Sequence, residues 1–320
     1  MPSSISLISP LNLMPVSGVL TESRMLAPIG VFDSGMGGLS IVQEIQAHLP
    51  NESIIYLADT KNVPYGQRTD SEICQLTSQA VAWLHQQGCK AVVVACNTAS
   101  AFSLTHLRDY YGADFPIIGL VPAVKPAVLK TQSKVVGVLA TPGTLRGNLL
   151  KDVIDQVAKP AHVKVITVVS PALVPFVEQG MQNSDECKAE LNAILWPLQQ
   201  AGADYLVLGC THYPFLKASI AAVFGSQFIL IDSGNAVARQ TGRVLSEQKI
   251  SFPTNGKIKN KATLQCFVTG SIQQAQPVLN DLMRHTGQLA PVVEHTVIEN
   301  SSAAASVCIM PIVALAKFER

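Results

Sequence analysis

The sequence predicts an α/β fold made of two pseudo-symmetric, three-layer domains with mainly parallel sheets and a cleft between them. Its 320 residues suit two domains of about 150 residues each. Short β-branched runs alternate with helical stretches of about 10 to 15 residues, which is typical of βαβ units. The sequence also repeats itself: residues 85–98 align without a gap on 199–212, and residues 29–35 align on 136–142.

The expected strands are apolar, rich in β-branched residues and bounded by turn signals. They are Ile29–Phe32, Ser53–Leu57, Ala91–Ala95, Ile117–Gly119, Val135–Ala140, Val163–Val169, Tyr205–Gly209, Phe228–Ile231 and Leu264–Val268. Helices are expected after Gly38, over Asp70–Gln87 and over Asp185–Gln200. Ligands of such sheets bind beyond the carboxyl ends of the strands, so the residues that follow each strand are candidates for a site.

Two segments indicate where the chain crosses between the halves. The proline-containing segment 120–133 precedes a new strand, and segment 232–240 follows the last strand of the repeat. We therefore expect a first α/β domain of residues 25–122 plus 234–299 and a second of residues 123–233. Outside them, residues 1–24 are expected to be a loose extension with Met25 as an alternative start, residues 300–320 a tail, and the polar segment 251–262 a surface loop.

Composition excludes several classes of protein. The 23 Lys and Arg residues balance 22 Asp and Glu residues, and aromatic residues make up only 6%, which argues against a nucleic-acid-binding surface. No window holds the roughly 18 apolar residues of a membrane span, and the first residues lack the basic region of a signal peptide. Seven scattered cysteines indicate reduced thiols. We expect a cytoplasmic protein that binds neither nucleic acid nor membranes.

Cys96 ends an apolar strand and is followed by Asn97 and Thr98 at the start of a predicted helix. The amide groups and dipole of a helix N-terminus favour a thiolate, so we expect a pKa lowered from about 8.5 towards neutrality. A lone buried cysteine is more often inert. We assign that inert role to the cysteines at positions 74, 89, 187, 266 and 308.

Cys210 occupies the equivalent position in the second half, with Thr211 and His212 directly after it. Two cysteines at matching strand ends suit proton transfer at two faces of one carbon. A cysteine pair could alternatively bind zinc. Neither Cys96 nor Cys210 belongs to a CxxC or HxH cluster and four ligands are not in evidence, so no metal is expected.

Two further segments follow strands and could contact a ligand. The loop DSGMGG, residues 33–38, resembles a nest whose backbone N–H groups bind an anion, although it lacks GxGxxG spacing and a P-loop lysine. Asp33 in this loop could equally be a helix cap. In residues 58–68, Pro64, Tyr65 and Gly66 form an expected turn that offers a hydroxyl and N–H groups; a plain surface turn is the alternative.

The motifs DSGMGG, LADTKNVPYGQR, VVACNTASA and LGCTHYP, in this order, resemble those of the glutamate racemases in the cofactor-independent aspartate/glutamate racemase superfamily. The resemblance covers about residues 29–271. It implies two pseudo-symmetric α/β domains, no cofactor and no metal, and interconversion of L- and D-glutamate for bacterial peptidoglycan. A homodimer is common in that family and is expected here on that ground alone.

The same resemblance implies roles for individual residues. The catalytic cysteines match Cys96 and Cys210, and Glu178 matches a glutamate that assists the second-domain side. Substrate contacts fall on Asp33, Ser34, Tyr65, Gly66, Asn97, Thr98, Thr211 and His212. We hypothesise that Asp33 tunes Cys96 and that His212, together with Glu178, tunes Cys210.

Three alternatives remain at this point. The first is an aspartate racemase, because aspartate racemases use the same cysteine chemistry. No arginine in a matched motif clamps a second carboxylate of the substrate. The expected donors to that carboxylate are Ser34, the Tyr65 hydroxyl and the Gly66 N–H. A non-catalytic two-domain amino-acid-binding protein needs the polar contacts but neither thiol. A cysteine-nucleophile amide hydrolase needs one thiol, a base and an oxyanion hole, and leaves the second cysteine unexplained.

Overall fold

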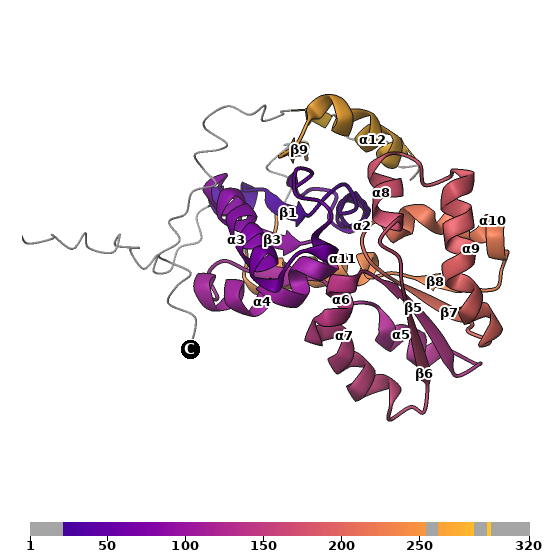
Figure 1. The fold of residues 1–320 in the computed structure, drawn as a ribbon. Coiled ribbons are helices and arrows are strands. Elements are labelled where there is room, and N and C mark those ends of the chain that lie inside the picture. The colour runs from indigo at the N-terminus through magenta and orange to yellow at the C-terminus, as the bar shows by residue number, and fades with distance from the viewer. Residues whose placement is uncertain (1–21, 254–261, 285–292, 296–320) are drawn as a thin grey trace, which may run out of the picture.

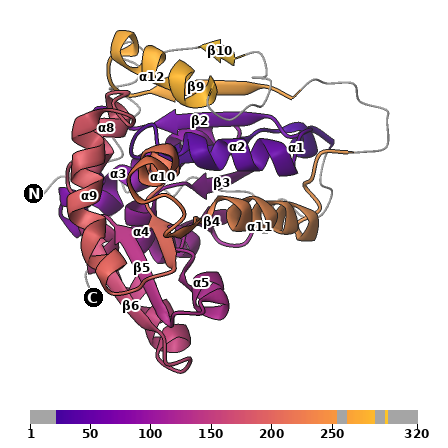
Figure 2. The ribbon, with the colours of Figure 1, turned by 90° about the vertical axis from the view of Figure 1, so that its right-hand side faces the viewer.

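The computed structural model describes residues 22–253, 262–284 and 293–295, which form two sheets surrounded by helices (Figures 1 and 2). The first part of the chain supplies α1 (Glu22–Leu26), β1 (Ile29–Asp33), α2 (Leu39–His48), β2 (Ile54–Ala58), η1 (Tyr65–Gln67), α3 (Asp70–Gln86), β3 (Ala91–Val94), α4 (Asn97–Tyr111) and β4 (Ile117–Gly119).

The chain then builds a second sheet and returns to the first. The elements are α5 (Val124–Lys130), β5 (Val135–Ala140), α6 (Pro142–Arg146), α7 (Asn148–Val153), η2 (Ile154–Ala158), β6 (Lys164–Val169), α8 (Leu173–Glu178), α9 (Asp185–Gln200), β7 (Tyr205–Gly209), η3 (Tyr213–Leu216), α10 (Lys217–Phe224), β8 (Ile229–Ile231), α11 (Gly234–Glu247), β9 (Leu264–Val268), α12 (Ile272–Arg284) and β10 (Val293–His295).

Strand order confirms the predicted two-half α/β fold. The six-stranded sheet has the order β10-β9-β2-β1-β3-β4 and the four-stranded sheet β6-β5-β7-β8, with every described strand pair parallel. The order β2-β1-β3-β4 therefore recurs as β6-β5-β7-β8, and β1 and β5 carry the aligned segments of the sequence repeat. We call the elements of the six-stranded sheet and its helices the first half, and β5–β8 with α5–α10 the second half.

The strands are buried because helices cover both faces of each sheet, as expected for parallel sheets. All residues of β1, β2 and β3 are buried, whereas the edge strand β6 is partly exposed. In the first half, α2 packs against α11 on one face and α3 against α4 on the other. Helix ends follow local signals: Thr69 and Glu72 form a capping box at α3, and Ser184 caps α9.

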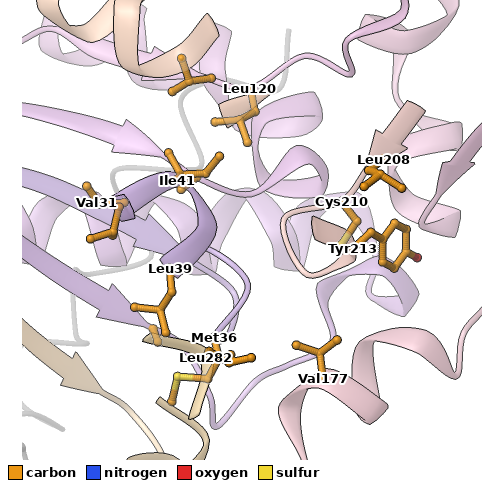
Figure 3. Packing of buried hydrophobic residues seen from close by; sticks show 14 of the residues in the cluster. Val31, Met36, Leu39, Ile41, Leu120, Val177, Leu208, Cys210, Tyr213 and Leu282 are labelled. Atoms are coloured by element: carbon orange, nitrogen blue, oxygen red, sulfur yellow. The ribbon is translucent and has the colours of Figure 1, made fainter. Parts of the chain in front are cut away.

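One hydrophobic cluster runs through both halves. It joins residues of β1 and α2 in the first half to residues of α8, α9 and β7 in the second. Figure 3 shows Met36 and Leu39 of the first half on the side of the cluster that faces Val177. The two halves therefore share apolar contacts beside the polar cleft, and these contacts stabilise their mutual orientation.

Some sequence predictions lie at the limits of the described residues. Residues 22–24, predicted as part of a loose extension, belong to helix α1, where Arg24 donates a hydrogen bond to the Asp114 carbonyl. Most of that extension, the predicted tail 300–320 and most of the predicted loop 251–262 lie outside the described residues. Strand β10 was not predicted. A search of the described residues finds no helix long and apolar enough to cross a membrane.

A buried ion pair lies at the end of the first sheet remote from the cleft. Lys90 Nζ lies 2.5 Å from Glu52 Oε2, and their side chains are 0% and 5% exposed. Lys90 also donates to the Met25 carbonyl at 2.8 Å, while Glu52 Oε1 accepts from the Phe252 N–H at 2.8 Å. The pair thus connects four segments that are far apart in sequence.

We predict that Glu52→Gln destabilises the protein by about 3 kcal/mol, because it leaves the Lys90 ammonium buried without a counter-charge. Urea unfolding followed by circular dichroism measures the change. Lys159→Gln is the matched control: it removes the exposed Lys159–Asp155 pair and should cost less than about 1 kcal/mol. Equal losses for the two variants would contradict the prediction.

Candidate active site

A pocket lies where the carboxyl ends of the two sheets meet. Its lining comes from both halves and includes residues that follow β1, β3, β5 and β7. The predicted site residues found there are Ser34, Tyr65, Gly66, Cys96, Asn97, Thr98, Cys210, Thr211 and His212. Asp33 and Glu178 do not line the pocket; they lie behind it, in contact with residues that do.

Cys96 caps the N-terminus of α4, as predicted, and its sulfur accepts a hydrogen bond from the Ala99 N–H at 3.4 Å. The expected lowering of its pKa is wrong. Burial, with a contribution from the nearby Asp33 carboxylate, raises the pKa of the Cys96 thiol to about 12. One long amide contact does not offset the loss of hydration. The thiol can instead donate to Ser34 Oγ at 3.5 Å, which favours the protonated form of Cys96.

Asp33 ends strand β1 and is completely buried. Its carboxylate accepts hydrogen bonds from Thr211 Oγ1 at 2.7 Å and from the Gly35 N–H at 2.8 Å. Burial raises the pKa of Asp33 to about 6, although the His212 charge acts in the opposite direction. No hydrogen bond between Asp33 and Cys96 is seen among the described contacts. Asp33 therefore acts on Cys96 through its charge, while its hydrogen bond to Thr211 joins the two halves.

Cys210, His212 and Glu178 form a connected row in the second half. The Cys210 sulfur lies 3.6 Å from His212 Nδ1, and His212 Nε2 lies 2.5 Å from Glu178 Oε1. Burial alone would lower the pKa of His212, but the hydrogen bonds and charges of Cys210 and Glu178 raise it well above its ordinary value. An imidazolium between a carboxylate and a sulfur stabilises a thiolate. The two thiols of the pocket thus have opposite electrostatic surroundings.

The glycine-rich loop does bind an anion, but the anion is a side chain of the protein. The Met36 N–H donates to Glu178 Oε1 at 2.6 Å, and the Gly37 N–H points at His212 Nε2 at 3.3 Å. The Gly35 N–H is already used by Asp33. The expectation of a nest open to a ligand is therefore replaced by a loop that contacts the second half.

Tyr65 lines the pocket, but its hydroxyl proton is committed elsewhere. The hydroxyl donates to Asp59 Oδ2 at 2.6 Å. Asp59, which is buried, also accepts from Thr269 Oγ1 at 2.6 Å and from Asn62 Nδ2 at 3.0 Å. The segment at Tyr65–Gly66 is thus fixed to the end of β9, and the Tyr65 hydroxyl is not available to donate to a ligand carboxylate while this bond is kept.

Sequence reasoning missed several groups of the pocket. Thr141 follows β5 and lies 2.8 Å, oxygen to oxygen, from Thr98; the repeat could have found it, because 141 − 34 equals the offset 136 − 29 that aligns β5 with β1. Ser170 also lines the pocket. Arg146 donates to the Gly66 carbonyl at 3.2 Å, which no motif indicated. Within the described residues, no cluster of three or more His, Cys, Asp or Glu side chains could hold a metal.

We predict that iodoacetamide alkylates Cys96 at pH 8 at least tenfold more slowly than it alkylates free cysteine. With a pKa of about 12, only about one thiol in ten thousand is ionised at that pH, and the higher nucleophilicity of a basic thiolate recovers only part of the rate. Peptide mass spectrometry measures the rate of Cys96 alkylation. Asp33→Asn removes the adjacent charge and should speed the reaction; a rate equal to that of free cysteine in the unsubstituted protein would contradict this account.

Comparison with known proteins gives a consistent family. The model of the Asp/Glu/Hydantoin racemase family matches residues 39–241. A glutamate racemase of Deinococcus radiodurans is 64% identical over 223 residues, which cover 70% of this chain and 76% of that protein.

Two solved structures have the same fold. The glutamate racemase of Escherichia coli in complex with L-glutamate and the activator UDP-MurNAc-ala has a TM-score of 0.71 and 32% identity, covering 86% of this chain and all of that one. The Francisella tularensis glutamate racemase in complex with D-glutamate has a TM-score of 0.72 and 28% identity, covering 87% and 99%. The chain belongs to the Asp/Glu/Hydantoin racemase family.

Proposed function

We propose that this protein is a glutamate racemase that interconverts L- and D-glutamate with two cysteine thiols and without a cofactor. The observation that carries the proposal is the presence of Cys96 and Cys210 at equivalent strand ends of the two halves, both lining one pocket. Relatives that are called glutamate racemases, at up to 64% identity, support glutamate as the substrate.

The reaction is a proton exchange at Cα. A thiolate on one side removes the Cα proton, so that a C–H bond breaks and an S–H bond forms, and the thiol on the other side gives its proton to the opposite face of the carbon. Because a Cα proton beside a carboxylate is a very weak acid, the site must hold the base close and stabilise the developing carbanion with fixed dipoles. The two thiols exchange roles with the handedness of the substrate.

The two thiols have different charges beside them. Burial and the Asp33 charge raise the pKa of Cys96, which favours the thiol there. The His212 imidazolium, supported by Glu178, faces the Cys210 sulfur and places a positive charge beside it. One thiol and one thiolate are the pair that a two-base racemisation needs, and we expect their titrations to be coupled.

Backbone and hydroxyl donors around the pocket are proposed to bind the two substrate carboxylates. Ser34, Asn97, Thr98, Thr211 and the backbone at Gly66 line it. The Asn97 Oδ1 atom is buried without a hydrogen-bond partner and, as an acceptor, suits the substrate ammonium group and not a carboxylate. Asp33 and Tyr65 are proposed to position these groups. A homodimer and supply of D-glutamate for peptidoglycan, which the family resemblance implies, are part of the proposal. So is a cytoplasmic location, which the scattered cysteines and the first residues of the sequence indicate.

The first experiment incubates the purified protein with L-glutamate in deuterated water, without added cofactor. We expect loss of the Cα proton signal by NMR together with decay of optical rotation to zero. L-Aspartate in a parallel sample tests the alternative substrate, and faster exchange with aspartate would move the assignment to an aspartate racemase. Binding of glutamate without exchange, in folded and reduced protein, would favour a non-catalytic amino-acid-binding protein.

The two-thiol mechanism predicts that Cys96→Ala and Cys210→Ala each lower racemisation by at least about a thousandfold, because each variant lacks one of the two proton carriers. Polarimetry measures the rate and circular dichroism checks the fold. Cys74→Ala, which changes a partly buried thiol on α3 outside the pocket, is the control and should keep full activity. A Cys96→Ala enzyme that racemises at the unsubstituted rate would refute the mechanism.

A further inference from the structure

Two glycines of the loop at residues 33–38 lie directly against the side chains that flank Cys210. A Cβ atom added at Gly37 would overlap the His212 ring, and one added at Gly35 would overlap the Glu178 carboxylate. Neither glycine has a positive φ, unlike Gly88, Gly112, Gly180, Gly202 and Gly225. Glycine is therefore required at these two positions by the space that the second half occupies, not by the backbone conformation.

The backbone of the loop also supplies hydrogen bonds to the same two side chains. The Met36 N–H donates to Glu178 Oε1 at 2.6 Å. The Gly37 N–H lies 3.3 Å from His212 Nε2, which itself lies 2.5 Å from that carboxylate oxygen. A protonated Nε2 donates to Glu178, whereas an unprotonated Nε2 can accept from Gly37. His212 Nε2 thus has a partner in either protonation state: Glu178, which the Met36 N–H holds, or the Gly37 N–H of the loop.

We propose that Gly35 and Gly37 are positioning residues for proton transfer at Cys210. They let the His212–Glu178 pair of the second half rest on the first half, and this contact fixes the imidazole with its Nδ1 atom 3.6 Å from the Cys210 sulfur. The base at one face of the substrate is therefore assembled from both halves of the chain. The catalytic consequence of this proposal rests on the proposed racemase function; the positioning itself does not.

The titratable groups around this contact come from both halves. They are Glu178 of α8, His212 after β7, Asp33 of β1, Cys96 before α4, Tyr56 of β2 and Tyr213 of η3. Asp33 and Tyr56 bond to Gly35, through its N–H and its carbonyl, whereas the side chain that a Cβ at Gly37 would meet is His212. A substitution at Gly37 should therefore change the environment of Cys210 while it leaves the hydrogen-bond partners of Cys96 in place.

The test compares Gly37→Ala with Gly242→Ala, a change inside helix α11 where the nearest atom to the new Cβ is a flexible Leu49 methyl group at 3.1 Å. Iodoacetamide labelling across pH 6 to 10, read by peptide mass spectrometry, gives separate profiles for Cys96 and Cys210. We expect Gly37→Ala to move the Cys210 midpoint upward by about one pH unit or more and to lower kcat at least tenfold. The Cys96 profile should change less than the Cys210 profile, because Cys210 is the smallest of the influences on the Cys96 pKa, and both profiles of Gly242→Ala should stay unchanged.

A paired substitution separates positioning from general damage. Glu178→Asp shortens the side chain that a Cβ at Gly35 would meet, so the double variant Gly35→Ala/Glu178→Asp should be no slower than Glu178→Asp alone, whereas independent effects would multiply. If Gly37→Ala does not fold, Gly37→Ala/His212→Ala removes the overlapping ring and should unfold at the same temperature as His212→Ala. A folded Gly37→Ala with an unchanged Cys210 profile, or multiplicative losses in the double variant, would overturn the proposal.

The labelling experiment needs no turnover, so it can fail or succeed independently of the racemase assignment. A shifted Cys210 profile in a protein that shows no Cα exchange would support the positioning role and reject the proposed function. An unchanged Cys210 profile in a protein that racemises glutamate would reject the positioning role and support the proposed function.

Discussion

The meeting of two parallel sheets at their carboxyl ends is the constraint on which the site depends. In each half, β1 or β5 lies next to the strand that ends at a cysteine, β3 or β7. The residues after these strands therefore point into a shared space, in the way that open parallel sheets place their ligands. Met36 and Leu39 of the first half and Val177 of the second belong to one apolar cluster, which stabilises this meeting. Hydrogen bonds between the halves, such as that from Thr211 to Asp33, then set the geometry of the site.

The repeat makes the two halves similar, and the chemistry depends on where they differ. Asp33 aligns with Ala140 at the offset that relates β1 to β5, and His212 aligns with Thr98 at the offset that relates Cys210 to Cys96. The acid beside one thiol and the imidazole beside the other thus replace uncharged residues at the equivalent positions. Two thiols with the same backbone setting therefore have opposite charges beside them, and desolvation and neighbouring charge influence a pKa more than strand position does.

Periodicity and the internal repeat predicted the fold well, because strand burial and helix capping are local properties. All nine predicted strands overlap observed ones, and α9 has the predicted bounds. The site was predicted as a set of residues, not as a set of interactions. The raised pKa of Cys96, the capture of the loop amides by Glu178 and the bond from Tyr65 to Asp59 depend on contacts between distant segments. Strand β10 has one apolar residue in three, unlike the equally short β4 and β8, so no apolar run indicated it.

The return of the chain to its first sheet has a consequence for the order of folding during synthesis. Strand β2 pairs with β9, whose residues lie 210 positions later, Leu264 opposite Ile54, whereas β5 to β8 are contiguous and pair only among themselves. The four-stranded sheet can therefore be completed while one edge of the earlier-made sheet is still open to other strands. Pairings of such long sequence separation form slowly, so the N-terminal strands would be the ones exposed to misassembly and to chaperones on the ribosome.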